Sequence, residues 1–118
     1  MKVKYNEVTD AIDYPQEVKV VITPEIAKVA GHYIQPWECP LTIFFNQFFE
    51  GKVKTYSYSD VAMVRAKGSK ETSGQMHDLV QYELADMFAE NQYHQVKKGG
   101  TFTTTAKLVP VTRLVIGN

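Results

Sequence analysis

Hydrophobic residues recur at spacings of three and four in the first part of the stretch Gln75 to Lys107. This spacing predicts one amphipathic helix, because such positions share one helical face. The helix can be capped by Thr72 or Ser73, and neither proline nor glycine interrupts it before Gly99. A turn at Lys97–Gly100 then ends the helix, because paired glycines favour turns. The predicted buried stripe consists of Met76, Leu79, Val80, Leu84, Met87 and Phe88.

The remaining pattern is that of strands rich in β-branched and aromatic residues. Leu41–Phe49, a turn at Glu50–Lys52 and an alternating strand at Val53–Arg65 predict a hairpin. The other predicted strands are Glu17–Thr23, Thr101–Val109 and Val111–Ile116, the last two being one strand if the chain bends at Pro110.

Four segments have a less regular pattern. Met1–Tyr14 fits a short strand or an arm, and Pro24–Ala30 fits either a helical turn or an irregular strand. Gly31–Pro40 fits a loop or a kinked strand end, and Ala66–Gly74 fits a loop. The predicted order is therefore β-β-β-β-α-β-β.

One helix among five or so strands predicts a mainly β fold of one domain spanning residues 1–118. A small closed barrel accounts for this order best, because closure removes exposed sheet edges. We expect an OB-fold-like five-stranded barrel with one α-helix between strands; a roll or a sandwich fits the order less well.

Composition places the chain among ordinary globular proteins, with 44% hydrophobic and 22% charged residues in 118. Its one cysteine, Cys39, permits no internal disulfide and fits a reducing compartment. The N-terminus lacks the hydrophobic core of a signal peptide, and the run Ile43–Phe45 is too short to span a bilayer. We therefore expect a cytoplasmic protein without membrane contact.

Charge is balanced overall, yet it is unevenly distributed. Lysine and arginine concentrate on the predicted strands, whereas Asp78, Glu83, Asp86 and Glu90 occupy the predicted helix. Such a distribution is compatible with a basic groove and an acidic back, or with solvated faces arranged by chance.

Catalytic and metal-binding patterns are not found in the sequence. His32, His77 and His94 are far apart and have no cysteine or carboxylate at zinc-ligand spacing. No phosphate-binding glycine loop, nucleophile elbow or HExxH pattern is present. We expect neither an enzyme nor a protein with a cofactor or metal.

The second half of the chain resembles single-stranded DNA-binding proteins of the OB-fold class. The resemblance rests on Glu83-Leu84-Ala85, on the turn Val96–Gly100 and on the strand Thr101–Leu108, preceded by Asp60–Lys67. The first half lacks the opening glycine-arginine strand of the bacterial proteins, and the chain ends without their acidic tail. The resemblance implies a compact version of the kind that bacteriophages encode for DNA replication or recombination, acting in the host cytoplasm.

Binding a single strand requires aromatic side chains that stack on bases and cations that contact phosphates. Lys54, Tyr56 and Tyr58 supply both on one face of a predicted strand. If Phe102 belongs to the core, Lys107 faces outward. The predicted nucleic-acid-binding residues are Tyr33, Trp37, Lys52, Lys54, Tyr56, Tyr58, Arg65, Lys67, Lys70 and Lys107.

An alternative function uses the same aromatic strands for protein contacts. The chain would then be a non-catalytic structural or adaptor protein, such as a phage assembly component. The resemblance further implies a homo-oligomer, a dimer or a tetramer, because one small barrel covers few nucleotides and gains affinity by multivalency.

Overall fold

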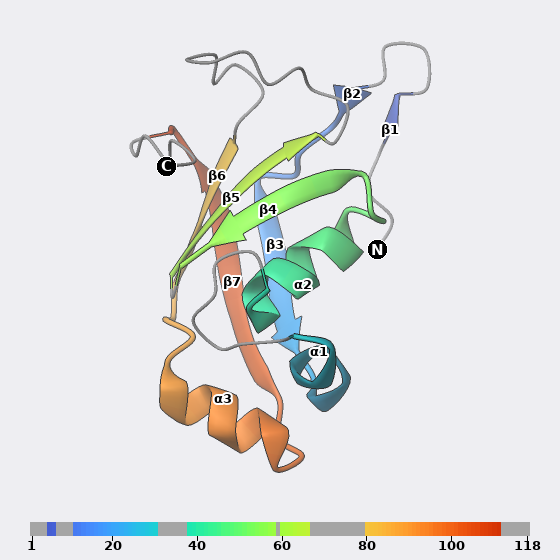
Figure 1. The fold of residues 1–118 in the computed structure, drawn as a ribbon. Helices are drawn as coiled ribbons and strands as arrows, with labels where there is room; N and C mark the ends of the chain where they lie inside the picture. The colour runs from blue at the N-terminus through green and yellow to red at the C-terminus, as the bar shows by residue number, and fades with distance from the viewer. Residues whose placement is uncertain (1–4, 7–10, 31–37, 59, 67–79, 112–118) are drawn as a thin grey trace.

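The computed structural model describes residues 5–6, 11–30, 38–58, 60–66 and 80–111. Five strands form one antiparallel sheet in the order β3-β7-β6-β5-β4. The sheet curls like a half-barrel, and helix α2 lies against its concave face (Figure 1). The strands of the sheet are β3 Glu17–Ile22, β4 Val53–Ser57, β5 Val61–Ala66, β6 Val80–Leu84 and β7 Phe102–Val109.

Three helices and a small second sheet complete the described part of the chain. Helix α1 (Pro24–Val29) follows β3 directly, α2 (Pro40–Phe48) precedes β4, and α3 (Glu90–Lys97) connects β6 to β7. Strands β1 (Tyr5–Asn6) and β2 (Ala11–Ile12) pair only with each other. The mainly β prediction is confirmed, with more helices than the one expected.

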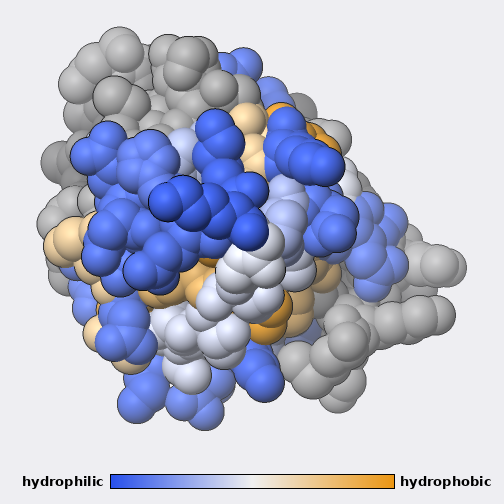
Figure 2. Space-filling view, turned by 90° about the horizontal axis from the view of Figure 1, so that it is seen from below, coloured by the Kyte–Doolittle hydropathy of each residue, from blue (hydrophilic) through white to orange (hydrophobic). Residues whose placement is uncertain are grey.

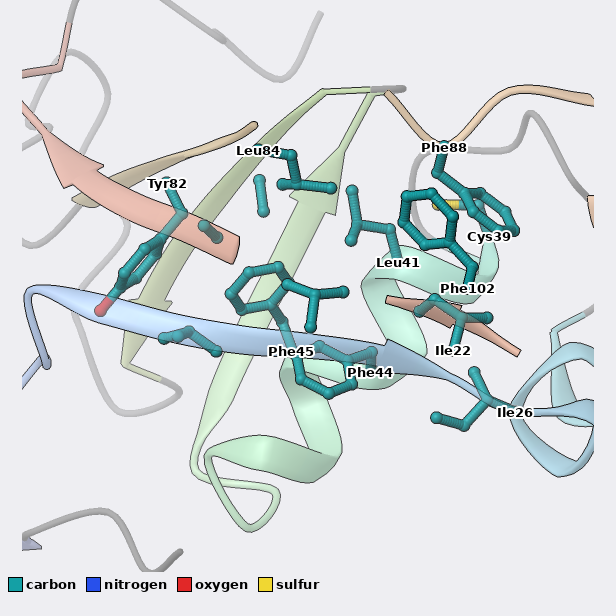
Figure 3. Packing of buried hydrophobic residues seen from close by; sticks show 14 of the residues in the cluster. Ile22, Ile26, Cys39, Leu41, Phe44, Phe45, Tyr82, Leu84, Phe88 and Phe102 are labelled. Carbon is teal, nitrogen blue, oxygen red and sulfur yellow. The ribbon is translucent and has the colours of Figure 1, made fainter. Parts of the chain in front are cut away.

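The hydrophobic core lies between the concave face of the sheet and α2. Alternation along β3 turns Val18, Val20 and Ile22 inward, and each is fully buried. From the opposite side, Leu41 and Phe45 of α2 reach toward the sheet (Figure 3). All the strands of the sheet and all three helices contribute residues to this core.

Leu41–Phe49, predicted as a strand, lies in helix α2 except for Phe49, which caps its C-terminal end. Pro40 occupies the first helical turn, where its fixed φ and missing N–H are tolerated. Leu41, Phe45 and Phe49 then follow at four-residue spacing and are all buried. The phenylalanines have high strand propensity, but packing against the curled sheet overrides it. Glu50–Lys52 therefore connects a helix to β4 and does not close a hairpin.

The prediction of one long helix beginning near Gln75 is wrong for residues 80–89. Val80–Leu84 forms β6, which pairs with β5 and β7. Tyr82 and Leu84 are buried against the core, Glu83 between them is exposed, and Gln81 on the other face is buried too. Met87, predicted to be core, is 53% exposed. Only Glu90–Lys97 is helical, and residues 67–79 lie outside the described part.

The predicted strand Val53–Arg65 is two strands, β4 and β5, which pair with each other. The chain reverses after Tyr58, whose N–H donates to the carbonyl oxygen of Val61 at 2.8 Å. The parity predicted for residues 53–58 holds within β4. Beyond the turn the predicted faces are reversed. Val61 and Met63 were predicted on the face opposite to Tyr56, but they share its face.

Several further predictions are confirmed. Residues Glu17–Ile22 and Phe102–Val109 are strands, and Pro24–Val29 is the helical alternative for its segment, begun by a proline and capped by Thr23. Phe102 belongs to the core, and Lys107 is exposed, as expected. The predicted strand Val111–Ile116 lies outside the described residues except for Val111, which is in no strand.

Candidate nucleic-acid interface

The convex face of the sheet carries most of the predicted binding residues that the structure describes. On β4, Val53, Thr55 and Ser57 point toward α2 and are buried, so Lys54 and Tyr56 point to the convex side. Register then assigns Met63 and Arg65 of β5 to the same side, because cross-strand partners share a face.

Two cations and two aromatic side chains meet at the β4–β5 pair. Lys54 lies directly opposite Arg65, and Tyr56 lies directly opposite Met63. Tyr58 follows on the same face and pairs with Val61. We call Lys54, Tyr56, Tyr58 and Arg65 the β4–β5 cluster. Their spacing matches what a single strand requires, cations for phosphates beside rings for bases.

The two tyrosines are in contact with each other. The Tyr58 hydroxyl donates to the Tyr56 hydroxyl at 3.0 Å, and the rings meet edge to face with centroids 5.1 Å apart. Tyr58 is 38% exposed, whereas Tyr56 is half-buried. Tyr58 is therefore the more accessible stacking surface, and Tyr56 supports it.

Lys107 shares the convex face but has acidic neighbours. Its cross-strand partners are Glu83 on β6 and Glu17 on β3. Glu83 also accepts a hydrogen bond from the Gln81 side-chain amide at 3.2 Å. The prediction that Glu83 belongs to an acidic helix is therefore wrong, because it lies within the sheet. Among the predicted binding residues that the structure describes, only Lys54 and Arg65 are cations that lie directly opposite each other on this face.

The remaining predicted residues divide into two groups. Lys52 is exposed in the turn that leads from α2 into β4. Tyr33, Trp37, Lys67 and Lys70 lie outside the described residues, so the structure does not place them relative to the β4–β5 cluster.

Two features of this face were missed from the sequence. Val61 and Met63 are on the convex side yet almost fully buried, with 2% and 1% exposure. Lys19 of β3 is an exposed cation on the same side. The alternation of Glu17–Ile22 was sufficient to place Lys19 outward, whereas the turn that reorients Val61 had no such signal.

The end of the molecule where α1 and α3 lie, at the bottom of Figure 1, has a largely hydrophilic surface (Figure 2). On α3, His94 lies 3.8 Å from Glu90, and the Lys97 ammonium lies 5.3 Å from the centre of the Tyr93 ring.

Among the described residues, no three His, Cys, Asp or Glu side chains lie close enough to hold a metal ion. No helix in the described part is long and hydrophobic enough to cross a membrane.

Comparison with protein families, with curated proteins and with solved structures gives no match for this chain.

Proposed function

We propose that this protein binds single-stranded DNA without sequence preference, through the convex face of β4 and β5. The observation that carries the proposal is the direct pairing of Lys54 with Arg65 beside the Tyr56–Tyr58 contact. An aromatic ring can stack on any base, and a cation can contact any phosphate. This arrangement therefore binds a single strand without preference for its sequence. In this proposal the curled sheet is an open, barrel-like form of the OB-fold that the resemblance implies.

The first test is fluorescence anisotropy with a labelled oligothymidine at two salt concentrations. Two phosphate contacts, at Lys54 and Arg65, give an expected slope of about −1.4 for log affinity against log salt. Lys54→Ala should halve this slope. Absence of binding at low salt would overturn the proposal, and the same oligomer as RNA would measure the preference between the two nucleic acids.

The aromatic part of the proposal is tested at Tyr58. Tyr58→Ala should weaken binding by about 5- to 150-fold, because a lost stack costs roughly 1–3 kcal/mol. Tyr58→Phe keeps the ring and loses only the hydroxyl, so its affinity should stay near that of the wild type. Lys98→Ala, an exposed cation after α3, is the control for a general loss of charge. Equal affinity of Tyr58→Ala and the wild type would remove this residue from the interface.

The second candidate is a non-catalytic adaptor that binds another protein by the same face. It is favoured by the alternation of Glu17, Lys107 and Glu83 across three adjacent strands. Such a mixed face suits a partner of mixed charge better than a polyanion. Binding of a protein partner with little salt dependence, together with no DNA binding, would select this candidate.

A further inference from the structure

The free edge of β3 has a definite pattern of main-chain groups. The Leu108 N–H donates to the carbonyl oxygen of Gln16 at 2.9 Å, which fixes the hydrogen-bonded pairs between β3 and β7. In an antiparallel ladder these pairs alternate, so Val18, Val20 and Ile22 bond to β7. The N–H and C=O groups of Glu17, Lys19 and Val21 therefore point away from the sheet.

The other edge of the sheet differs in exposure. By the same alternation, the Tyr58–Val61 bond directs the main-chain groups of Val53, Thr55 and Ser57 away from β5. These three residues are only 1%, 1% and 2% exposed. The edge of β4 is therefore covered, and α2 packs against this strand. On β3, by contrast, Glu17 and Lys19 are both exposed.

An uncovered edge strand is a template for another strand, and proteins commonly protect such edges. Within the described part of the chain, β3 has β7 as its one strand partner. No ion pair of Glu17 or Lys19 is found among the described residues. The edge thus offers main-chain groups together with one acid and one base.

We propose that two copies of this chain associate through antiparallel pairing of their β3 edges. The charges make the edge self-complementary. In a two-fold register centred on Val18, Glu17 lies opposite Lys19 of the partner subunit, and Lys19 lies opposite the partner subunit's Glu17. Both pairs are hydrogen-bonding positions, so each exchanges two main-chain bonds. Opposite charges directly across strands are favourable, and like charges are not.

A register shifted by one residue is disfavoured by the same charges. Centring the two-fold axis on Lys19 would place the two Lys19 side chains opposite each other. The register centred on Val18 is favoured because it forms two opposite-charge pairs, and the dimer would contain one continuous sheet from two copies. This inference does not depend on nucleic-acid binding, because it concerns β3 and not the β4–β5 cluster.

Sedimentation velocity over a concentration series, without nucleic acid, tests the proposal. The wild-type chain should dimerise in a concentration-dependent manner. Lys19→Glu should be monomeric over the same range, because it places glutamates opposite glutamates. Glu17→Lys should also be monomeric, although it additionally faces Lys107 within its own sheet. Circular dichroism verifies that both variants are folded.

The decisive sample is an equimolar mixture of the two variants. Each is repelled by its own kind, but together they restore both opposite-charge pairs, so the mixture should form a heterodimer. Lys98→Glu and Lys54→Glu make the same charge change elsewhere and should dimerise like the wild type. Lys54→Glu should at the same time lose DNA affinity, which separates this proposal from the proposed function.

A wild-type chain that stays monomeric at all concentrations would overturn the proposal. So would a dimer that Lys19→Glu leaves intact, or a mixture of the two variants that fails to associate.

Discussion

At the scale of single residues, Tyr82 connects the centre of the sheet to the segment before β3. Its ring is fully buried against Phe45, with ring centroids 5.5 Å apart, and its hydroxyl donates to the carbonyl oxygen of Pro15 at 2.6 Å. This one side chain thus joins β6, α2 and the segment before β3. Its removal should affect the whole fold.

We expect Tyr82→Phe to lower the free energy of unfolding by about 1–3 kcal/mol, because the Pro15 carbonyl loses its buried donor. Urea denaturation followed by circular dichroism measures the loss. Tyr58→Phe is the matched control, since it removes a hydroxyl from the exposed Tyr56–Tyr58 pair. Equal losses for the two variants would show that burial of the Tyr82 hydroxyl is not the cause.

Because of Tyr82, we expect the folded protein to lose stability at alkaline pH. Burial, with a smaller effect of the neighbouring Tyr14, raises the pKa of Tyr82 above its usual value of 10.0. The unfolded chain then releases this proton at a lower pH than the folded chain does. Stability is therefore retained below about pH 10 and falls as the pH rises further. Tyr82→Phe should show a shallower decline in melting temperature above pH 10 than the wild type.

A second residue contact joins a loop to a strand. The Thr104 hydroxyl of β7 donates to the Asp86 carboxylate at 2.9 Å and accepts from the Asp86 N–H at 3.0 Å. Asp86 was predicted to lie on a helix, where its side chain would face solvent. Its actual role is to hold the segment between β6 and α3 against the sheet.

At the scale of elements, secondary structure could be predicted where residue propensity and the hydrophobic pattern point to the same structure. Glu17–Ile22 and Phe102–Val109 combine strand-forming residues with strict alternation, so propensity and packing agree. They disagree at α2, where phenylalanines favour a strand but their spacing favours a helix. At β6, Gln81, Glu83 and Leu84 favour a helix, but Val80 and Tyr82 favour a strand, and pairing with β5 and β7 decides for the strand.

The candidate site was predictable only within one strand. Lys54, Tyr56 and Tyr58 share a face by parity alone, and the structure agrees. Their pairing with Arg65 depends on the turn after Tyr58, which the sequence pattern did not show. The acidic neighbours of Lys107 depend on the position of β6, which was predicted as helix.

The turn between α2 and β4 provides a test at this scale. Glu50 and Gly51 both have positive φ, at 56° and 75°. A Cβ at Gly51 would contact nothing within 4 Å, so only the backbone conformation opposes a side chain there. We expect Gly51→Ala to cost roughly 1 kcal/mol of stability, and Gly51→Asn less, because asparagine tolerates this region. Urea unfolding measures both; an alanine variant as stable as the wild type would contradict the strained turn.

At the scale of the whole molecule, one core joins every strand of the large sheet to all three helices. No described element has a core of its own, so loss of one should weaken the others. Small domains of this kind commonly unfold in a single transition. The curled sheet and α2 are thus expected to be lost together, and a local probe in their interface should report the global transition.

The sequence supplies that probe in its one cysteine. Cys39 precedes α2, is 6% exposed, and forms hydrogen bonds with Ser57 of β4 at 2.9 Å and with Thr42 at 3.5 Å. Thr42 and Ser57 also bond to each other, so the thiol is enclosed by buried hydroxyl groups. Separation of α2 from β4 would break the Cys39–Ser57 contact and expose this sulfur to a thiol reagent.

The labelling rate of Cys39 therefore measures how often the protein opens, without any engineered reporter. If the core is a single unit, the opening free energy from labelling should equal the unfolding free energy from urea and fall with the same dependence on denaturant. Rapid labelling in the absence of urea would instead show that α2 detaches while the sheet stays intact. The helix mistaken for a strand would then be the least firmly held part of the fold.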